Sequence, residues 1–193
     1  MNSARNITGI ILAGGKSSRM GSDKGFLQWK GRTFIEHILG ALRPVVNEIL
    51  IVSNNKAYDI LGHTRLNDAI HNAGPLAGLY TGLKESKTHL NLVVSCDVPL
   101  ITAPLWTQLI AHYQKGDNAV VYKDCEKTMP LIGLYTKECE CLCLRLLERD
   151  ERRMMQFLKD LNNVRYMQVE GESQKQIRNI NTLADLKEIE NEY

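Results

Sequence analysis

The residues best suited to chemistry follow an apolar run near the start of the chain, where glycine and cationic side chains alternate. Gly14 and Gly15 allow close ligand approach that a Cβ atom would obstruct, so their N–H groups can face an anion. Lys16, Arg19 and Lys24 can neutralise several anionic oxygens. The spacing matches neither the Walker A motif nor Gly-x-Gly-x-x-Gly. The segment predicts a loop for a nucleotide triphosphate, and the alternative is a surface turn with solvated lysines.

A single carboxylate, Asp97, marks the second place where chemistry is expected. It ends the apolar run 90–96 and stands just before Val98 and Pro99. An ionised carboxylate at the end of a buried strand is costly to desolvate without a partner, and a hydrated Mg²⁺ bound to nucleotide phosphates is a suitable one. Asp97 is therefore a predicted Mg²⁺ ligand. The alternative is a helix cap or a turn residue.

Further polar residues follow the next predicted strand along the chain. Ser53, Asn54 and Asn55 come at its carboxyl end, where ligands bind in open α/β sheets, so they either contact a base or ribose or cap the following helix. Asp68 is expected at the rim of the nucleotide site. The segment from Gly74 to Gly78 has small residues that allow a flat ring to come close, although a structural helix entry explains it equally well.

Two pairs of residues late in the chain suit a second, anionic substrate. Arg152 and Arg153 stand at the head of a predicted helix, where two guanidinium groups can bind a phosphate or simply form a solvated face. Asn179 and Asn181 lie two residues apart, so in an extended segment both amides point the same way. They either contact a polar ring or a metal-bound phosphate, or they cap the last helix.

Strands that alternate with helices are expected to position these groups. This alternation predicts a single-domain, three-layer α/β/α fold of Rossmann-like type over residues 1–193, with a mostly parallel sheet. The strands are expected near residues 7–12, 48–53, 90–96, 118–123, 129–135 and 164–169. The helices are expected at 33–42, 56–61, 74–83, 102–113, 136–161 with a break at 148–153, and 182–189.

Composition excludes several classes of partner. The net charge of +2 and the dispersed lysines and arginines argue against nucleic-acid binding, and no apolar run approaches membrane-spanning length. A cytoplasmic location is expected, with the five cysteines reduced. Three of them, at 139, 141 and 143, lie in a helical pattern that points residues two apart to different sides, which argues against a shared metal site.

Taken together, the motifs resemble those of molybdenum cofactor guanylyltransferases of the MobA type, within the nucleotidyltransferase superfamily. The motif that begins at Leu12 is common to many nucleotidyltransferases. The segments Glu151-Arg-Arg-Met154 and Asn179-Ile-Asn-Thr182 narrow the resemblance to this branch. The matching segments are Leu12-Ala-Gly-Gly-Lys-Ser-Ser-Arg-Met-Gly21 with Asp23-Lys24, Gly74-Pro-Leu-Ala-Gly78, Cys96-Asp-Val-Pro99, Glu151-Arg-Arg-Met154 and Asn179-Ile-Asn-Thr182.

The resemblance implies transfer of GMP from GTP to the phosphate of the molybdenum-pterin cofactor, with Mg²⁺ and release of pyrophosphate. It implies catalytic roles for Arg19, Lys24 and Asp97, with Asp97 holding the metal, and transient contact with proteins that deliver the cofactor or receive it. Arg152, Arg153, Asn179 and Asn181 would then face the pterin. The nucleotide would contact Leu12, Ala13, Gly14, Gly15, Lys24, Ser53, Asn54, Asp68, Gly78 and Asp97.

Two other functions fit the same residues. The loop chemistry does not distinguish bases, so a cytidylyltransferase acting on the same pterin, or a nucleotidyltransferase acting on a sugar or polyol phosphate, is the nearest alternative. A nucleotide-binding cofactor carrier without catalytic activity is the alternative from another class. The combination of Arg19, Lys24 and Asp97 argues against the carrier, because binding alone does not require it.

Overall fold

The main sheet of this computed structural model joins strands from almost the whole chain. The structure describes residues 6–14, 23–70, 73–124 and 127–192, and within them seven strands stand in the order β5, β4, β1, β6, β8, β7, β9. All neighbouring strands pair in parallel except β8, which is antiparallel to both β6 and β7. The strands are β1 Ile7–Leu12, β4 Glu48–Val52, β5 Thr64–Leu66, β6 Leu90–Ser95, β7 Ala119–Lys123, β8 Thr128–Thr136 and β9 Val164–Gln168. The predicted mostly parallel sheet is confirmed.

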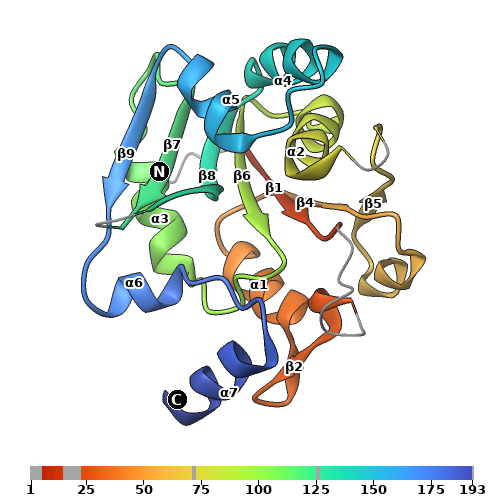
Figure 1. Cartoon of the computed structure of the whole chain (residues 1–193), viewed down its shortest axis with the longest axis vertical. Helices are drawn as coiled ribbons and strands as arrows, with labels where there is room; N and C mark the ends of the chain where they lie inside the picture. The colour runs from red at the N-terminus through yellow and green to blue at the C-terminus, as the bar shows by residue number, and fades with distance from the viewer. Residues whose placement is uncertain (1–5, 15–22, 71–72, 125–126, 193) are drawn as a thin grey trace.

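Helices cover both faces of this sheet (Figure 1). The strand β1 shows why, because its successive side chains alternate between two apolar clusters, with Ile7 and Ile11 in one and Ile10 and Leu12 in the other. One cluster includes α1 Phe34–Leu42 and α3 Ala103–His112, and the other includes α2 Gly74–Glu85, α4 Cys139–Glu148 and α5 Met154–Asp160. The arrangement is the predicted three-layer α/β/α fold.

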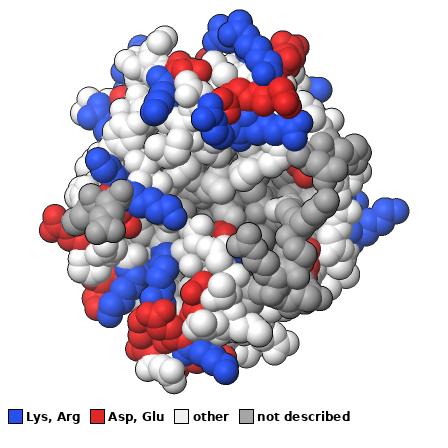
Figure 2. Space-filling model, viewed as in Figure 1, with Lys and Arg blue, Asp and Glu red and all other residues white. Residues whose placement is uncertain are grey.

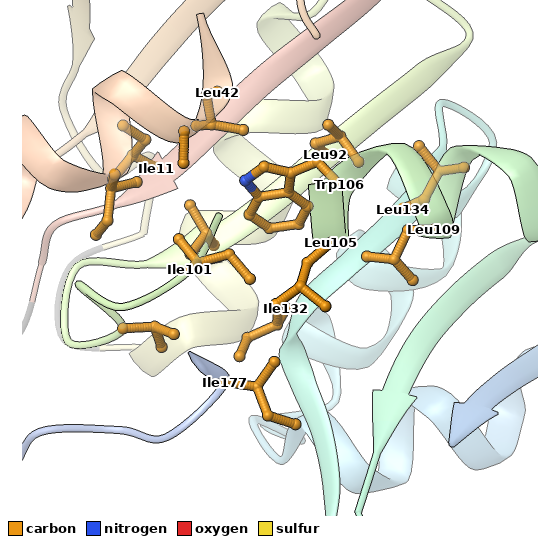
Figure 3. Packing of buried hydrophobic residues seen from close by; sticks show 14 of the residues in the cluster. Ile11, Leu42, Leu92, Ile101, Leu105, Trp106, Leu109, Ile132, Leu134 and Ile177 are labelled. Carbon is orange, nitrogen blue, oxygen red and sulfur yellow. The ribbon is translucent and has the colours of Figure 1, made fainter. Parts of the chain in front are cut away.

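The core is filled by large side chains from helices and central strands. Trp106 of α3 is completely buried, and Figure 3 shows it among Leu42 of α1, Leu92 of β6 and Ile101. Buried aromatic and branched side chains of this size contribute a large share of the hydrophobic stabilisation. The core thus fixes the strand ends to which the site residues are attached.

Local signals explain where the helices begin. A capping box starts α1: the Thr33 side chain accepts from the Glu36 amide, and the Glu36 carboxylate accepts from the Thr33 amide over 2.7 Å. Proline occupies the first turn of α2 and of α3, where no backbone N–H is needed. In α4 the thiols of Cys139 and Cys143 are buried while Cys141 is exposed, so the predicted helical arrangement of the three is confirmed.

Several short elements were not predicted from the sequence. A hairpin of β2 Gln28–Trp29 and β3 Arg32–Thr33 precedes α1, and positive φ angles at Lys30 and Gly31 form its turn. The predicted helix at 56–61 is a 3-10 helix, η2 Lys56–Leu61. The other additions are β5, the 3-10 turn η1 Lys24–Phe26 and the short helix α6 Glu172–Gln176, which precedes the predicted last helix, α7 Leu183–Glu192. Among the described residues, no helix is long and apolar enough to cross a membrane.

Gly82 of α2 is required for close packing of this helix on β1. A Cβ atom built there would overlap Ile10 Cγ2. We expect Gly82→Ala to destabilise the protein by about 1–3 kcal/mol, because a well-packed core must shift to admit the methyl group. Gly40→Ala is the matched control, since Gly40 is an exposed glycine in α1 with open space around it, and helix propensity predicts a gain of about 0.5–1 kcal/mol. Urea unfolding measures both, and equal effects would contradict the packing argument.

Candidate active site

A cavity of about 550 Å³ opens where the parallel strands β1, β4 and β6 end. Figure 2 shows the molecule hollowed in the middle of the face presented in Figure 1. This edge of an open α/β sheet is where ligands bind. Its lining includes many of the predicted nucleotide contacts. The lining residues are Leu12, Ala13, Gly14, Asp23, Val52, Ser53, Asn54, Asn55, Asp68, Ala73, Gly74, Pro75, Gly78, Ser95 and Leu131.

Two glycines make room for the carboxylate of Asp68 in this cavity. A Cβ atom on Gly14 would stand 3.2 Å from Asp68 Oδ2, and one on Gly78 would stand 3.7 Å from Asp68 Oδ1. The carboxylate therefore lies between the end of β1 and the first turns of α2. A side chain at Gly14 would push against it. The sequence placed Asp68 at the rim of the nucleotide site, and the structure places it in the cavity wall.

The polar residues after β4 support this wall. The side-chain oxygen of Asn54 accepts a hydrogen bond of 3.1 Å from the Asp68 amide, so Asn54 fixes Asp68. Asn55 caps η2 through a 3.0 Å bond from the amide of Ala57. Ser53 is buried and accepts from the Asn55 amide over 3.2 Å. All three residues line the cavity, and Asn55 also has the capping role that the sequence left open.

Three side chains from distant parts of the chain meet beside the cavity. The Lys24 ammonium lies 3.7 Å from Asp97 Oδ2 and donates to the side-chain oxygen of Asn181 over 2.6 Å. A backbone bond of 2.7 Å from the Ile180 amide to the Asp97 carbonyl holds the last of these segments in place. Lys24 and Asp97 are largely buried, with 19% and 14% of their side-chain surface exposed. The predicted convergence of the cationic turn and the lone acid is therefore present.

Asp97 has the properties of a metal ligand. Its Oδ1 atom is buried and has no hydrogen-bond partner within the described part of the chain. A buried carboxylate oxygen left in this state is costly, and a hard cation that prefers oxygen ligands removes the cost. The described ranges contain no cluster of three or more His, Cys, Asp and Glu side chains suited to a metal. A single carboxylate suits an ion that completes its shell with water and substrate phosphates.

Cys96, which precedes Asp97, is buried, and this environment disfavours its reactive thiolate form. Burial raises the pKa of its thiol to about 12, and the negative charges of Asp97 and Asp23 add to this effect. The thiolate is the reactive form of cysteine, so a thiol with this pKa stays neutral and inert. The arrangement therefore favours direct transfer between two bound substrates over a covalent intermediate on this cysteine.

The residues predicted for the second substrate fall into two groups. Asn181 belongs to the cluster around Lys24, and Thr182, not Asn181, caps α7 through a 3.1 Å bond from the Asp185 amide. Asn179 is half-buried on the same segment. Because Ile180 between them is buried, both asparagines belong to the surface side of this segment.

The second group consists of Arg152 and Arg153, which immediately precede α5. In Figure 1, α5 lies higher than the end of β6, whereas α6 and α7 lie lower than that strand end. Arg152 lies 2.7 Å from Asp150, and Arg153 donates to both oxygens of Glu151 and lowers the pKa of that carboxyl. Both guanidinium groups remain accessible, with half and three quarters of their side-chain surface exposed. The predicted contact of these arginines with a substrate phosphate stays a prediction.

Some predicted site residues lie outside the described residues, and two described residues were missed. Gly15, Lys16 and Arg19 belong to the first category. Asp23 lines the cavity and was not assigned a role from the sequence, although it forms a motif with Lys24. Its position next to the predicted phosphate contact was the available signal. Tyr58, which bonds to Asp23, carried no signal at all.

Comparison with known proteins agrees with this geometry. The structure of molybdopterin-guanine dinucleotide biosynthesis protein A from Archaeoglobus fulgidus superposes with a TM-score of 0.81 at 24% identity, covering 95% of this chain and 97% of the other, so the two share a fold. The shared fold is a Rossmann-like α/β fold, with the cavity at the ends of its parallel strands.

Sequence relatives narrow this class to one family. The probable molybdenum cofactor guanylyltransferase of Flavobacterium johnsoniae is 36% identical over 183 residues, covering 95% of this chain and 96% of the relative. The molybdenum cofactor guanylyltransferase of Serratia proteamaculans is 38% identical over 184 residues, covering 93% and 91%. The model of the MobA-like NTP transferase domain matches residues 9–164. The chain therefore belongs to the family of MobA-like NTP transferases.

Proposed function

We propose that this protein is a molybdenum cofactor guanylyltransferase, which transfers GMP from GTP to the phosphate of the molybdenum-pterin cofactor. The products are the guanine dinucleotide cofactor and pyrophosphate. The observation that carries the proposal is the meeting of Lys24, Asp97 and Asn181 beside the cavity at the strand ends. The family and the names of the relatives support the choice of substrates. The proposed metal is Mg²⁺, bound by Asp97.

The chain's own residues would act by holding and neutralising two anions. An oxygen of the pterin phosphate attacks the α-phosphorus of GTP in line, a new P–O bond forms, and the bond from the α-phosphorus to the bridging oxygen breaks to release pyrophosphate. Lys24 holds the triphosphate and stabilises the charge that develops on the leaving group. Asn181 fixes the direction of the ammonium. A bound Mg²⁺ would supply further neutralisation of phosphate charge.

The second substrate is proposed to bind on the far side of the reacting phosphorus. Arg152 and Arg153 offer accessible guanidinium groups, which suit bidentate binding of a phosphate. Asn179 and Asn181 offer amides to the pterin from the opposite segment. We also infer a cytoplasmic location, one nucleotidyltransferase domain over residues 1–193, and transient contact with proteins that deliver or receive the cofactor.

Pyrophosphate release tests the proposed reaction. Incubation with Mg²⁺, molybdenum-loaded pterin and GTP is expected to release pyrophosphate and form the dinucleotide, whereas CTP in place of GTP is expected to give at most a small fraction of the rate. A higher rate with CTP would make the protein a cytidylyltransferase. Activity with a sugar or polyol phosphate but not with pterin would reassign the acceptor. Tight GTP binding without metal-dependent pyrophosphate release would indicate a carrier.

A further inference from the structure

Both carboxylate oxygens of Asp23 accept hydrogen bonds from within the protein, in contrast to Oδ1 of Asp97. Its Oδ1 atom accepts from the Gly25 amide over 3.1 Å and from the hydroxyl of Tyr58, and its Oδ2 atom accepts 2.8 Å from the side-chain nitrogen of Asn55. A carboxylate with both oxygens bonded inside the protein is poorly suited to bind a metal ion. Asp23 must therefore have another role, although it lines the nucleotide cavity.

Tyr58 packs against the turn that carries Lys24. Its side chain is completely buried and its ring stacks on Phe26, with ring centroids 4.6 Å apart and planes at 25°. A Cβ atom on Gly25 would overlap the Tyr58 hydroxyl. Burial raises the pKa of the phenol far above its usual value, so the hydroxyl stays protonated and donates. Tyr58 thus contacts the residues on both sides of Lys24.

We propose that Tyr58 and Asp23 are positioning residues that fix the turn η1 so that the ammonium of Lys24 stands between Asp97 and Asn181. The lysine itself has a flexible four-carbon side chain, and its place in the site depends on where its backbone is held. Asp23 caps η1 by accepting a hydrogen bond from the Gly25 amide. Asn55, in the loop after β4, and Tyr58 both donate to the Asp23 carboxylate and so hold the cap in place. The proposal rests on the proposed function, in which Lys24 binds the triphosphate.

The same contacts link the lysine to the nucleoside wall. Asn55 follows Asn54, whose side chain holds the amide of Asp68 in the cavity wall. The hydrogen bond from Asn55 to Asp23 therefore connects the loop that shapes the nucleoside pocket to the turn that binds phosphate. Among the described residues, the Tyr58 hydroxyl bonds to Asp23 and not to Asn54 or Asp68, which form the nucleoside wall. Loss of the hydroxyl therefore disturbs the turn that carries Lys24 and leaves that wall in place. It should thus affect turnover more than nucleotide binding.

The variant Tyr58→Phe tests this proposal against a matched control, Tyr122→Phe. Tyr122 is also completely buried, and its hydroxyl donates 2.6 Å to the Leu105 carbonyl, away from the site. We expect Tyr58→Phe to lower kcat for GTP-dependent pyrophosphate release by about 10-fold or more, as for other residues that orient a binding group, with little change in the KM for GTP. Tyr122→Phe should leave both constants unchanged. Equal effects of the two variants, or an unchanged kcat for Tyr58→Phe, would overturn the proposal.

A measurement without substrates separates this proposal from the proposed function. The rate at which an N-hydroxysuccinimide ester acylates Lys24 is measured by peptide mass spectrometry, with the exposed Lys56 and Lys187 in the same digest as references. Release of Lys24 from its partners should raise its labelling several-fold in Tyr58→Phe and not in Tyr122→Phe. Unchanged Lys24 labelling overturns the positioning role. If the wild-type protein releases no pyrophosphate from any nucleoside triphosphate, the proposed function fails, and the labelling still decides the role of Tyr58.

Discussion

Asp97→Asn is expected to lower kcat for pyrophosphate release on the order of 10²-fold or more, because the amide keeps the shape of the side chain but loses the charge that holds Mg²⁺. The carboxylate has one buried oxygen with no hydrogen-bond partner in the described part of the chain, and its other oxygen lies 3.7 Å from the Lys24 ammonium. The substitution therefore weakens the attraction for the metal ion and for the lysine together. Pyrophosphate release across a Mg²⁺ titration measures the effect. The folded state should persist, as thermal unfolding can verify.

The control for this variant is Asp117→Asn, which makes the same chemical change far from the strand ends. The Asp117 carboxylate pairs with Arg165 of β9 over 2.9 and 3.2 Å, and these bonds lower its pKa. Asp117→Asn should therefore reduce stability and leave the Mg²⁺ dependence of turnover unchanged. Undiminished pyrophosphate release by Asp97→Asn would remove Asp97 from the metal site.

Lys24→Ala is expected to lower kcat/KM for GTP by on the order of 10²-fold or more, since it removes a cation from a largely buried position beside the reacting phosphates. Pterin binding should change far less, because Lys24 is proposed to contact the triphosphate. Steady-state kinetics with GTP as the varied substrate, together with calorimetric titration of the pterin, measures the two effects separately.

Lys137→Ala is the matched control for the lysine variant. The Lys137 ammonium donates 2.7 Å to the Lys84 carbonyl and lies 3.1 Å from Glu140, so it ties α2 to α4 and does not face the cavity. Its loss should lower the stability of the protein without altering the kinetics of GTP. If Lys24→Ala weakens pterin binding as much as the GTP reaction, the cause is disturbed folding and not a lost phosphate contact.

The sequence predicted the sheet well because its strands are short apolar runs separated by turn and cap signals. The sequence did not predict the position of β8 between β6 and β7 in the sheet. The connection of four residues from β7 to β8 allows a hairpin and no crossover, so their antiparallel pairing follows from its length. The pairing of β8 with β6 does not, because it depends on packing between elements distant in sequence. The short strand β5 pairs only at the sheet edge and had no apolar pattern to reveal it.

The site was predictable to the extent that strand ends carry ligands. Lys24 and Asp97 follow two strands that pair in parallel, so their approach was expected from topology. The bond of Asn181 to Lys24 spans 157 positions and follows no periodic pattern. The contact between Tyr58 and Asp23 was hidden for a related reason, because a tyrosine in a 3-10 helix has no motif. Such contacts are fixed by tertiary packing, which no local signal records.

The segment that reaches Asp97 through Ile180 has a consequence for synthesis on the ribosome. A nascent chain contains Lys24 and Asp97, the proposed metal ligand, before Asn181, which bonds to the lysine, has been made. The strands β1 and β6 can pair during that interval, but the Lys24 ammonium, which is proposed to bind phosphate, still lacks its partner Asn181. Under the proposed function, the orientation of Lys24 is therefore complete only after the segment with Asn181, 157 positions further along the chain, has been translated and has docked.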